Sequence, residues 1–171
     1  LETFMSLSMH SASVPVFVKM LGNLLTWLDK AQAHAEARRF DPVQYLSLKL
    51  APDMLPLTRQ IQIATDAAKG CAARLAGHEV PKWADDESTL DQLRERVRRT
   101  IDYVQSVPAA AFEGSETREV VLQLRAGELR YQGEDYLRHF ALPNFYFHVT
   151  TTYALLRQAG VEIGKRDFLG Q

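Results

Sequence analysis

The sequence predicts an all-α protein: a four-helix bundle with a long crossover connection between its third and fourth helices that carries a small β-hairpin. Two observations predict this fold. Apolar residues recur at three- and four-residue spacing in four segments, three of them roughly 18 to 25 residues long. Between the third and fourth of these segments, apolar and polar residues alternate instead.

The length and composition fit one domain with its own core. The chain has 171 residues, of which 46% are hydrophobic and 24% are charged. We place a single domain at residues 5–171. Residues 1–4 precede Met5, a plausible natural start, and are expected to be a cloning remnant or part of an alternative start.

The first helix is expected at residues 14–38, where Pro15 is acceptable because it falls in the first turn. A brief helical turn should follow at residues 43–48. The second helix should begin soon after Asp53 and end at Gly77. Gly70 in its interior costs about 1 kcal/mol relative to alanine, unless close helix packing requires a residue without a side chain.

The third helix should follow a polar loop at residues 78–87, with Ser88 as its N-cap and Pro108 soon after its end. Its basic residues have acidic neighbours, so we expect a solvated helix face. These residues are Arg94, Arg96, Arg98 and Arg99, with Asp91 and Glu95 beside them.

Residues 108–133 form the long connection, which we expect to cross an end of the bundle or lie along its side. Its hairpin signal is an alternating run at 120–124, a turn at Ala126-Gly127 and a second alternating run at 129–131. A short helical turn should follow at residues 134–140.

The fourth helix should open at Pro143 and close at Gly160. It carries Asn144, His148 and Thr152 at four-residue spacing, which places the three side chains on one face. We therefore expect a small polar site inside an otherwise apolar bundle. In the tail that follows, Phe168 and Leu169 are expected to dock on the bundle.

Charge and cysteine content narrow the setting. The formal net charge of −1 gives no general attraction to nucleic acid or to an anionic membrane, so neither is expected as a partner. No apolar run reaches the ~20 residues needed to span a bilayer. The single Cys71 can form no intrachain disulfide, and a reducing, cytoplasmic location is the expectation.

His148 is the leading candidate for chemistry, because a histidine on so apolar a helix needs a polar partner when it is buried. One interpretation is a core histidine bonded to a carbonyl, tyrosine or threonine. The other is a ligand pocket that it shares with Asn144 and Thr152, with Gln60 bonding across the bundle from the second helix.

Two further residues are weaker candidates for the same pocket. Asp53 lies seven residues before Gln60, on nearly the same helical face, although capping of the second helix explains it more simply. His10 precedes the first helix and either serves a capping or turn role or folds over the mouth of the pocket. No P-loop, GxSxG, GxGxxG or HExxH motif is present.

Three segments carry a resemblance to a known family: MHSASVPVF at 9–17, LAPDMLPLTRQ at 50–60, and LPNFYFH at 142–148 with the run that continues to Phe168-Leu169-Gly170. They resemble a bacterial family of uncharacterised proteins, a domain of unknown function. That family is allied to the DinB/YfiT-like four-helix bundles, a superfamily of proposed metalloenzymes.

The resemblance implies a four-helix bundle that forms a homodimer, and it implies where a metal would sit. Metal-binding DinB-like proteins hold a divalent ion with one histidine on helix two and two histidines four residues apart on helix four. Here His148 resembles the second helix-four ligand, and Asn144 stands at the position of the first. Helix two contains no histidine, and Asp53 or Gln60 is its nearest polar substitute. An amide oxygen is a poor transition-metal ligand beside imidazole, so the three-histidine site is expected to be degraded.

Three functions therefore stay open, and whether the protein is an enzyme is undecided. The first is binding of a small molecule in a polar pocket around His148. The second is a hydrolase or transferase that depends on a divalent metal held by His148 and Asp53. The third is a non-enzymatic, dimeric interaction protein whose polar core groups fix the register of the helices.

Overall fold

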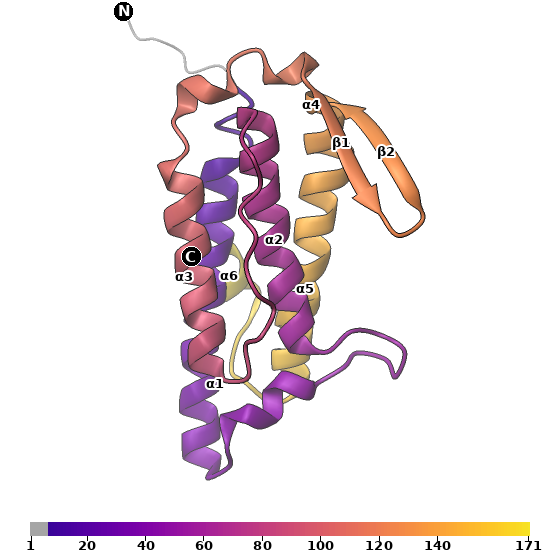
Figure 1. The fold of residues 1–171 in the computed structure, drawn as a ribbon. Helices are drawn as coiled ribbons and strands as arrows, with labels where there is room; N and C mark the ends of the chain where they lie inside the picture. Colours follow the sequence, from indigo (N-terminus) through magenta and orange to yellow (C-terminus); the bar gives the residue numbers. More distant parts are fainter. Residues whose placement is uncertain (1–6) are drawn as a thin grey trace, which may run out of the picture.

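The computed structural model describes residues 7–171, so the expectations for residues 1–4 and Met5 lie outside the described residues. Four long helices form the bundle, as the sequence predicts (Figure 1). They are α1 (Val14–Arg38), α2 (Leu57–Ala76), α3 (Leu90–Ser106) and α5 (Leu142–Gln158). The turn expected near residues 43–48 is a 3-10 helix, η1 (Pro42–Ser47).

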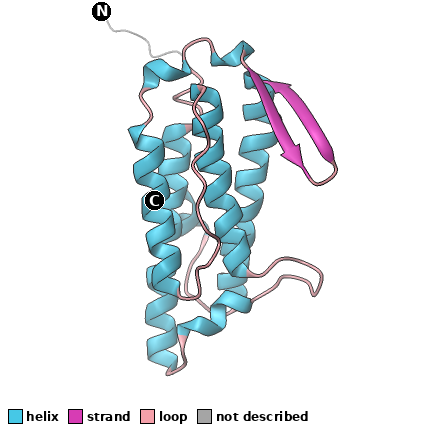
Figure 2. Cartoon of the chain, in the orientation of Figure 1, coloured by secondary structure: helices cyan, strands magenta, loops and turns pink. Residues whose placement is uncertain are grey.

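The direction of the helices differs from that of a simple up-down bundle. Residues 77–89, which we call the strap, run back along the whole bundle before α3 begins (Figure 2). As a result α3 runs parallel to α2, whereas α1 and α5 run in the opposite direction. The sequence identified 78–87 only as a polar loop and missed this lengthwise crossover.

Two of the expected helix caps are wrong. Asp53 lies exposed in the loop before α2, and the residue at the N-cap of α2 is Pro56, so Asp53 does not cap the helix. Thr89, not Ser88, caps α3, and its hydroxyl accepts a hydrogen bond from the amide of Gln92. At the other end of α2, Gly77 adopts φ of 72° and terminates the helix as predicted.

The helix that contains α5 begins earlier than expected. Helical backbone runs without a break through α4 (Gly133–Tyr136), a π-helical segment η4 (Leu137–Ala141) and α5. Pro143 lies in the first turn of α5 as predicted, but the helical backbone before it was not expected to be continuous with α5. Proline has no amide N–H to donate to the preceding turn, and the π-helical segment just before Pro143 is the kind of local widening that accommodates such a gap.

The predicted hairpin is present, although its turn lies at Arg125 and Ala126, one residue earlier than expected. Strands β1 (Glu119–Leu124) and β2 (Gly127–Gln132) pair antiparallel, with Val120 opposite Tyr131 and Leu122 opposite Leu129. Before β1, the connection forms two short 3-10 helices, η2 (Ala109–Phe112) and η3 (Ser115–Thr117), across one end of the bundle.

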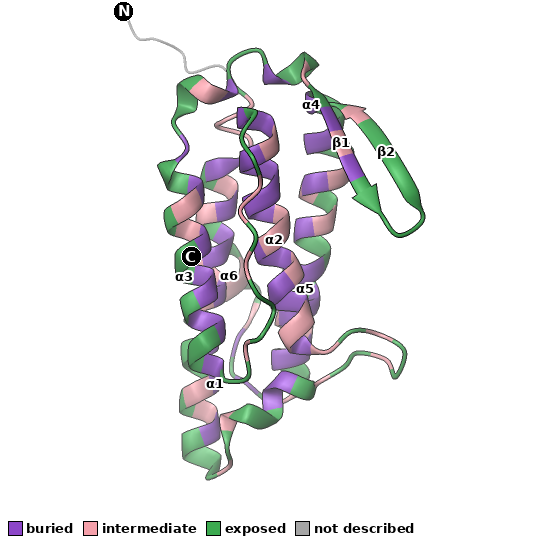
Figure 3. Cartoon of the chain, in the orientation of Figure 1, coloured by how far each residue is buried: buried purple, intermediate pink, exposed green. Residues whose placement is uncertain are grey.

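The core fills the space between the four long helices, whose inward faces are buried (Figure 3). Phe17 and Phe145 meet edge to face across it, with ring centroids 4.8 Å apart. The C-terminal helix α6 (Lys165–Leu169) docks on α1, and Phe168 stacks on Trp27 at 5.6 Å. Leu169, also expected to dock, is largely exposed. No helix within residues 7–171 is both long and apolar enough to cross a membrane.

A buried arginine cluster joins the strap to α2 and α3, which corrects the prediction that the basic residues of α3 are all solvated. Arg96 is buried and reaches Thr65 and Asp66 on α2 at 2.8 and 2.9 Å. Arg96 also forms ion pairs with two residues of the strap, Glu87 at 3.0 Å and Asp85 at 3.0 Å. Arg94 is also buried, whereas Arg98 and Arg99 are exposed.

Trp83 of the strap is held in a second way. Lys69 of α2 and Arg99 of α3 each place their charge 4.3 Å from the centre of its ring. Such cation–π contacts stabilise the packing of an aromatic ring that remains partly exposed. The strap is therefore fixed along its length by charge and by aromatic contacts.

Candidate functional site

The seam between the antiparallel helices α2 and α5 brings together two of the predicted site residues. His148 Nδ1 lies 2.7 Å from Gln60 Oε1, and both side chains are buried, with 8% and 1% of their surface exposed. Gln60 lies in the first turn of α2 and His148 near the middle of α5. The four-residue spacing of the polar face of α5 aims His148 at α2, where an apolar side chain would otherwise be expected.

The neighbouring hydrogen bond fixes the tautomer of His148. Gln60 Nε2 donates to the backbone carbonyl of Leu55 at 3.0 Å, and a carbonyl can only accept. The amide oxygen of Gln60 therefore faces the imidazole, so His148 Nδ1 carries the proton and donates it. In the neutral ring, Nε2 is then an unprotonated acceptor.

His148 Nε2 has no hydrogen-bond partner within residues 7–171. In the same described part of the chain, Ser115 Oγ is the only side-chain polar atom that is both fully enclosed and without a hydrogen-bond partner. Because His148 Nε2 also lacks a partner, it must keep some contact with solvent. Nε2 is therefore not completely enclosed, although the ring as a whole is buried.

The environment keeps His148 neutral. Burial, and to a smaller extent the positive charge of Arg59, lower the pKa of His148 to about 4. A neutral imidazole with a defined tautomer can accept a hydrogen bond, take up a proton, or coordinate a metal through Nε2.

The other predicted members of this site do not join the His148–Gln60 pair. The Thr152 hydroxyl is turned back to its own helix and donates to the His148 carbonyl at 2.9 Å. Asn144 is half-buried one turn away and lines a separate groove of about 160 Å³. Asp53 is exposed in the loop before α2, and His10 lies at the opposite end of the bundle, edge-on to Phe112 at 5.2 Å.

The groove that contains Asn144 lies between α2, the hairpin and the start of α5. Arg74 and Tyr136 also line it, and Arg74 Nη1 lies 3.1 Å from the Tyr136 hydroxyl. A Cβ at Gly70 would overlap the guanidinium of Arg74. Gly70 therefore leaves room for the side chain one turn along its own helix, and not for close packing of a neighbouring helix.

The donor set around His148 does not suit a tightly held transition metal. Within residues 7–171, no group of three His, Cys, Asp or Glu side chains is placed to hold a metal ion. The neighbours of His148 along the seam, Gln60 and Asn144, offer amide groups, which are weak ligands for zinc or nickel. Asp53, the carboxylate proposed as a second ligand, lies in the exposed loop outside the seam.

Sequence reasoning missed the residues that assemble the strap. Arg96 was grouped with its exposed neighbours because Asp91 and Glu95 make the whole helix face look solvated. A signal was present in the acidic run Asp85-Asp86-Glu87, which lies just before α3 and supplies two of the partners of Arg96.

Comparison with known proteins agrees with this architecture. The profile of a family described as a domain of unknown function, DUF1993, matches residues 9–169. A crystal structure of a DinB family member from Shewanella denitrificans superposes with a TM-score of 0.89. The two chains are 40% identical, and the match covers 95% of this chain and 92% of the other. No curated protein matches the sequence. The chain therefore belongs to the DUF1993 family, and it is a DinB-like four-helix-bundle protein.

Proposed function

We propose that this protein binds a small polar molecule at the α2–α5 seam, with His148 as the recognising group, and that the three-histidine metal site of its superfamily is degraded. One observation carries the proposal: the Gln60 amide holds the Nδ1–H tautomer of His148, so Nε2 is an acceptor that is not completely enclosed. An imidazole that only filled the core would need no exposed acceptor.

The chemistry of the seam selects the ligand class. Because Nε2 of His148 accepts a hydrogen bond, the ligand must donate one, from a hydroxyl, an amide or an ammonium group. The nearby positive charge of Arg59 disfavours an ammonium group, so a neutral alcohol or amide is the better match.

The test follows the His148 ring by NMR. Long-range ¹H–¹⁵N correlations should show Nδ1 protonated and Nε2 unprotonated at pH 7. A fragment set of small alcohols and primary amides should then shift the His148 Nε2 resonance, with loss of the effect in His148→Phe. The matched control is His78→Phe, an exposed loop residue. The Nε2–H tautomer, or no shift of Nε2 by any fragment, would refute the proposal.

The degraded metal site is tested by restoring it. Gln60→His with Asn144→His returns the three-histidine pattern that the resemblance implies around His148. We expect stoichiometric zinc or nickel binding by this double variant in isothermal titration, and no stoichiometric binding by the native protein. Stoichiometric binding by the native protein that disappears in His148→Ala would instead favour a divalent-metal-dependent hydrolase or transferase.

A second candidate function, a dimeric interaction protein, has its own supporting observation. Phe147 is 55% exposed and Tyr146 is 38% exposed, side by side on the outer surface of α5. Tyr146 also lines an apolar groove of about 480 Å³ with Met20 and Leu169. Exposed aromatic side chains of this kind mark interaction surfaces.

The partner in this second candidate is another copy of the chain. Light scattering after size exclusion should give the mass of a homodimer, and Phe147→Glu should convert it to a monomer. Thr150→Glu, one turn further along α5 and also exposed, is the control for added charge. A native protein that is monomeric at all concentrations would rule this candidate out.

A further inference from the structure

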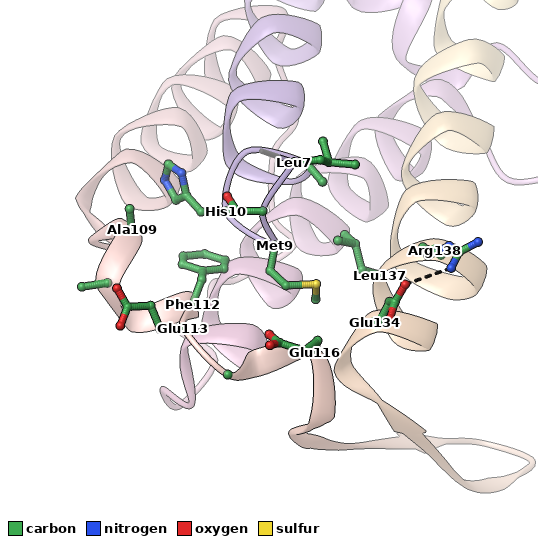
Figure 4. A pocket seen from close by; sticks show the side chains of 14 residues that line it. Leu7, Met9, His10, Ala109, Phe112, Glu113, Glu116, Glu134, Leu137 and Arg138 are labelled. Atoms are coloured by element: carbon green, nitrogen blue, oxygen red, sulfur yellow. Dashed lines mark hydrogen bonds and ion pairs between the residues drawn. The ribbon is translucent and has the colours of Figure 1, made fainter. Parts of the chain in front are cut away.

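A pocket lies at the end of the bundle away from the His148 seam (Figure 4). We call it the end pocket; its volume is about 680 Å³. Three stretches far apart in the sequence form it: residues 7–12 before α1, residues 109–116 of η2 and η3, and residues 134–138 of α4 and η4. Its size lies in the range of pockets that enclose small organic ligands.

The walls of the end pocket are apolar. Met9, Phe112 and Leu137 line its interior, with alanines at its edges. Phe112 is itself buried, and its ring packs nearly at a right angle against His10, which also lines the pocket, with ring centroids 5.2 Å apart. A methionine can adapt its shape to a ligand, whereas the phenyl ring offers a fixed aromatic surface.

The charges of the end pocket are unbalanced. Glu113, Glu116 and Glu134 are spread along one side of it (Figure 4). Glu134 accepts a hydrogen bond from Arg138 at 2.9 Å, which neutralises one carboxylate. Within residues 7–171, Glu113 and Glu116 have no cationic partner within 4 Å. The lining thus combines an apolar, aromatic interior with an excess of negative charge.

We propose that the end pocket binds an organic monocation with an apolar body, such as a hydrophobic amine or quaternary ammonium compound. The apolar body lies between Met9, Phe112 and Leu137. The cationic group faces Glu113 and Glu116, and the Phe112 ring contributes a cation–π contact. Neutral ligands gain only the apolar contacts, and anions are repelled by the two carboxylates.

The test compares three probes of the same carbon skeleton: 4-phenylbutylammonium, 4-phenylbutan-1-ol and 4-phenylbutanoate. Binding to the full chain is followed by NMR of the methionine methyl groups at low ionic strength, with Met9 assigned from Met9→Leu. We expect the ammonium to bind at least roughly fivefold more tightly than the alcohol, and the anion most weakly. With the ammonium probe the Met9 methyl should shift, whereas the His148 ring, where the charge of Arg59 disfavours a cation, should not.

The variant Glu113→Gln with Glu116→Gln should remove this preference. Both residues are exposed, so folding should be retained. The double variant should weaken ammonium binding roughly threefold or more and leave alcohol binding unchanged. Glu162→Gln, exposed near the other end of the bundle, is the charge control and should bind as the native protein does. Equal affinity for ammonium and alcohol, an unaffected double variant, or no saturable shift of Met9 would each overturn the proposal.

Discussion

At the scale of single residues, His148 shows how one hydrogen bond sets the chemistry of a buried group. An imidazole removed from water must satisfy at least one nitrogen, and Gln60 does so through its oxygen. Because an amide oxygen carries no full charge, it does not stabilise a protonated ring as a carboxylate would. The result is a neutral acceptor, and not a cation, between α2 and α5.

This protonation behaviour predicts a pH dependence of stability. The pKa of His148 is about 4 in the folded protein and 6.5 in the unfolded chain, so only the unfolded state takes up a proton between these values. The neutral His148 ring therefore contributes fully to the free energy of unfolding above about pH 6.5. This contribution, on the order of 2 kcal/mol in total, is lost as the pH falls toward 4. Urea unfolding at pH 7.5 and 4.5 should show a smaller loss in His148→Gln than in the native protein.

His78→Gln is the control for this experiment, because His78 is exposed in the strap. It should lose as much stability as the native protein does. An NMR-titrated pKa of His148 near 6.5 would contradict the assignment of the ring as a buried neutral group.

Gly133 is the other position where a single residue decides a contact. A Cβ there would overlap the backbone carbonyl oxygen of Ser115, because η3 crosses directly over the start of α4. Gly22 in the middle of α1 is different, since a Cβ there would meet no atom within 4 Å.

The two glycines therefore predict opposite effects of alanine. Gly133→Ala should lower the free energy of unfolding by about 2 kcal/mol or more, because backbone must move. Gly22→Ala should raise it by roughly 0.5 to 1 kcal/mol, through helix propensity and a less flexible unfolded chain. Chemical denaturation of both variants measures the difference, and a neutral Gly133→Ala would show that η3 can shift freely.

At the scale of elements, the strap is the feature that sets the order of the bundle. The strap is an extended, mostly polar segment that lies along α2 (Figure 2), so it buries too little apolar surface to be held by hydrophobic packing alone. Charged contacts to α2 and α3 replace that surface, and Arg96 supplies most of them, with a side chain only 2% exposed. Burial raises the pKa of Asp85, but hydrogen bonds and charge from Arg59 and Arg96 outweigh it and lower the pKa overall.

Replacement of Arg96 should therefore release the strap. Arg96→Met keeps the apolar stem but leaves Asp66, Asp85 and Glu87 close together without their shared cation. We expect a loss of about 3 kcal/mol or more in stability, as for other broken buried ion clusters. Amide hydrogen exchange should accelerate in residues 78–89 before it does so elsewhere.

Arg98→Met provides the matched comparison on the exposed face of the same helix. Its stability should change by less than about 0.5 kcal/mol. Similar effects of the two substitutions would mean that the strap is not held by the Arg96 cluster.

At the scale of the whole molecule, the C-terminal segment completes the bundle. Phe168 stacks on Trp27, and the indole N–H of Trp27 donates to the Asp167 carbonyl at 3.1 Å. The Asn23 side chain donates to the Phe168 carbonyl at 2.9 Å. The last residues of the chain thus cover a tryptophan near the middle of the first helix, which is completely buried.

Loss of the Phe168 ring should expose this tryptophan. In a Trp83→Phe background, where Trp27 is the remaining tryptophan, Phe168→Ala should shift its fluorescence to longer wavelength. The melting temperature should also fall, with a cost of about 2 to 3 kcal/mol. The control is Leu169→Ala, at the exposed residue next to Phe168. It should change neither the fluorescence wavelength nor the melting temperature appreciably.

Local patterns predicted most of the elements because each pattern depends on neighbours in sequence. The bounds of α1, the glycine end of α2 and the presence of the hairpin all follow from spacing and turn residues. Pro143 marks the first turn of α5, but its position gives no sign that the π-helical segment before it joins α5 to α4 without a break.

For the candidate site, helical spacing predicts a polar group at His148 on an apolar helix and offers Gln60 as one possible partner, since each interrupts an apolar stripe. The folded structure is needed to show which nitrogen of His148 is bonded, that Asn144 opens into a different groove, and that Asp53 lies outside. It also decided that Arg96 is buried, because its partners come from a strap whose path no local pattern records. Periodicity fixes which face of a helix is apolar, but contacts between distant segments depend on how the helices and their connections are arranged in space.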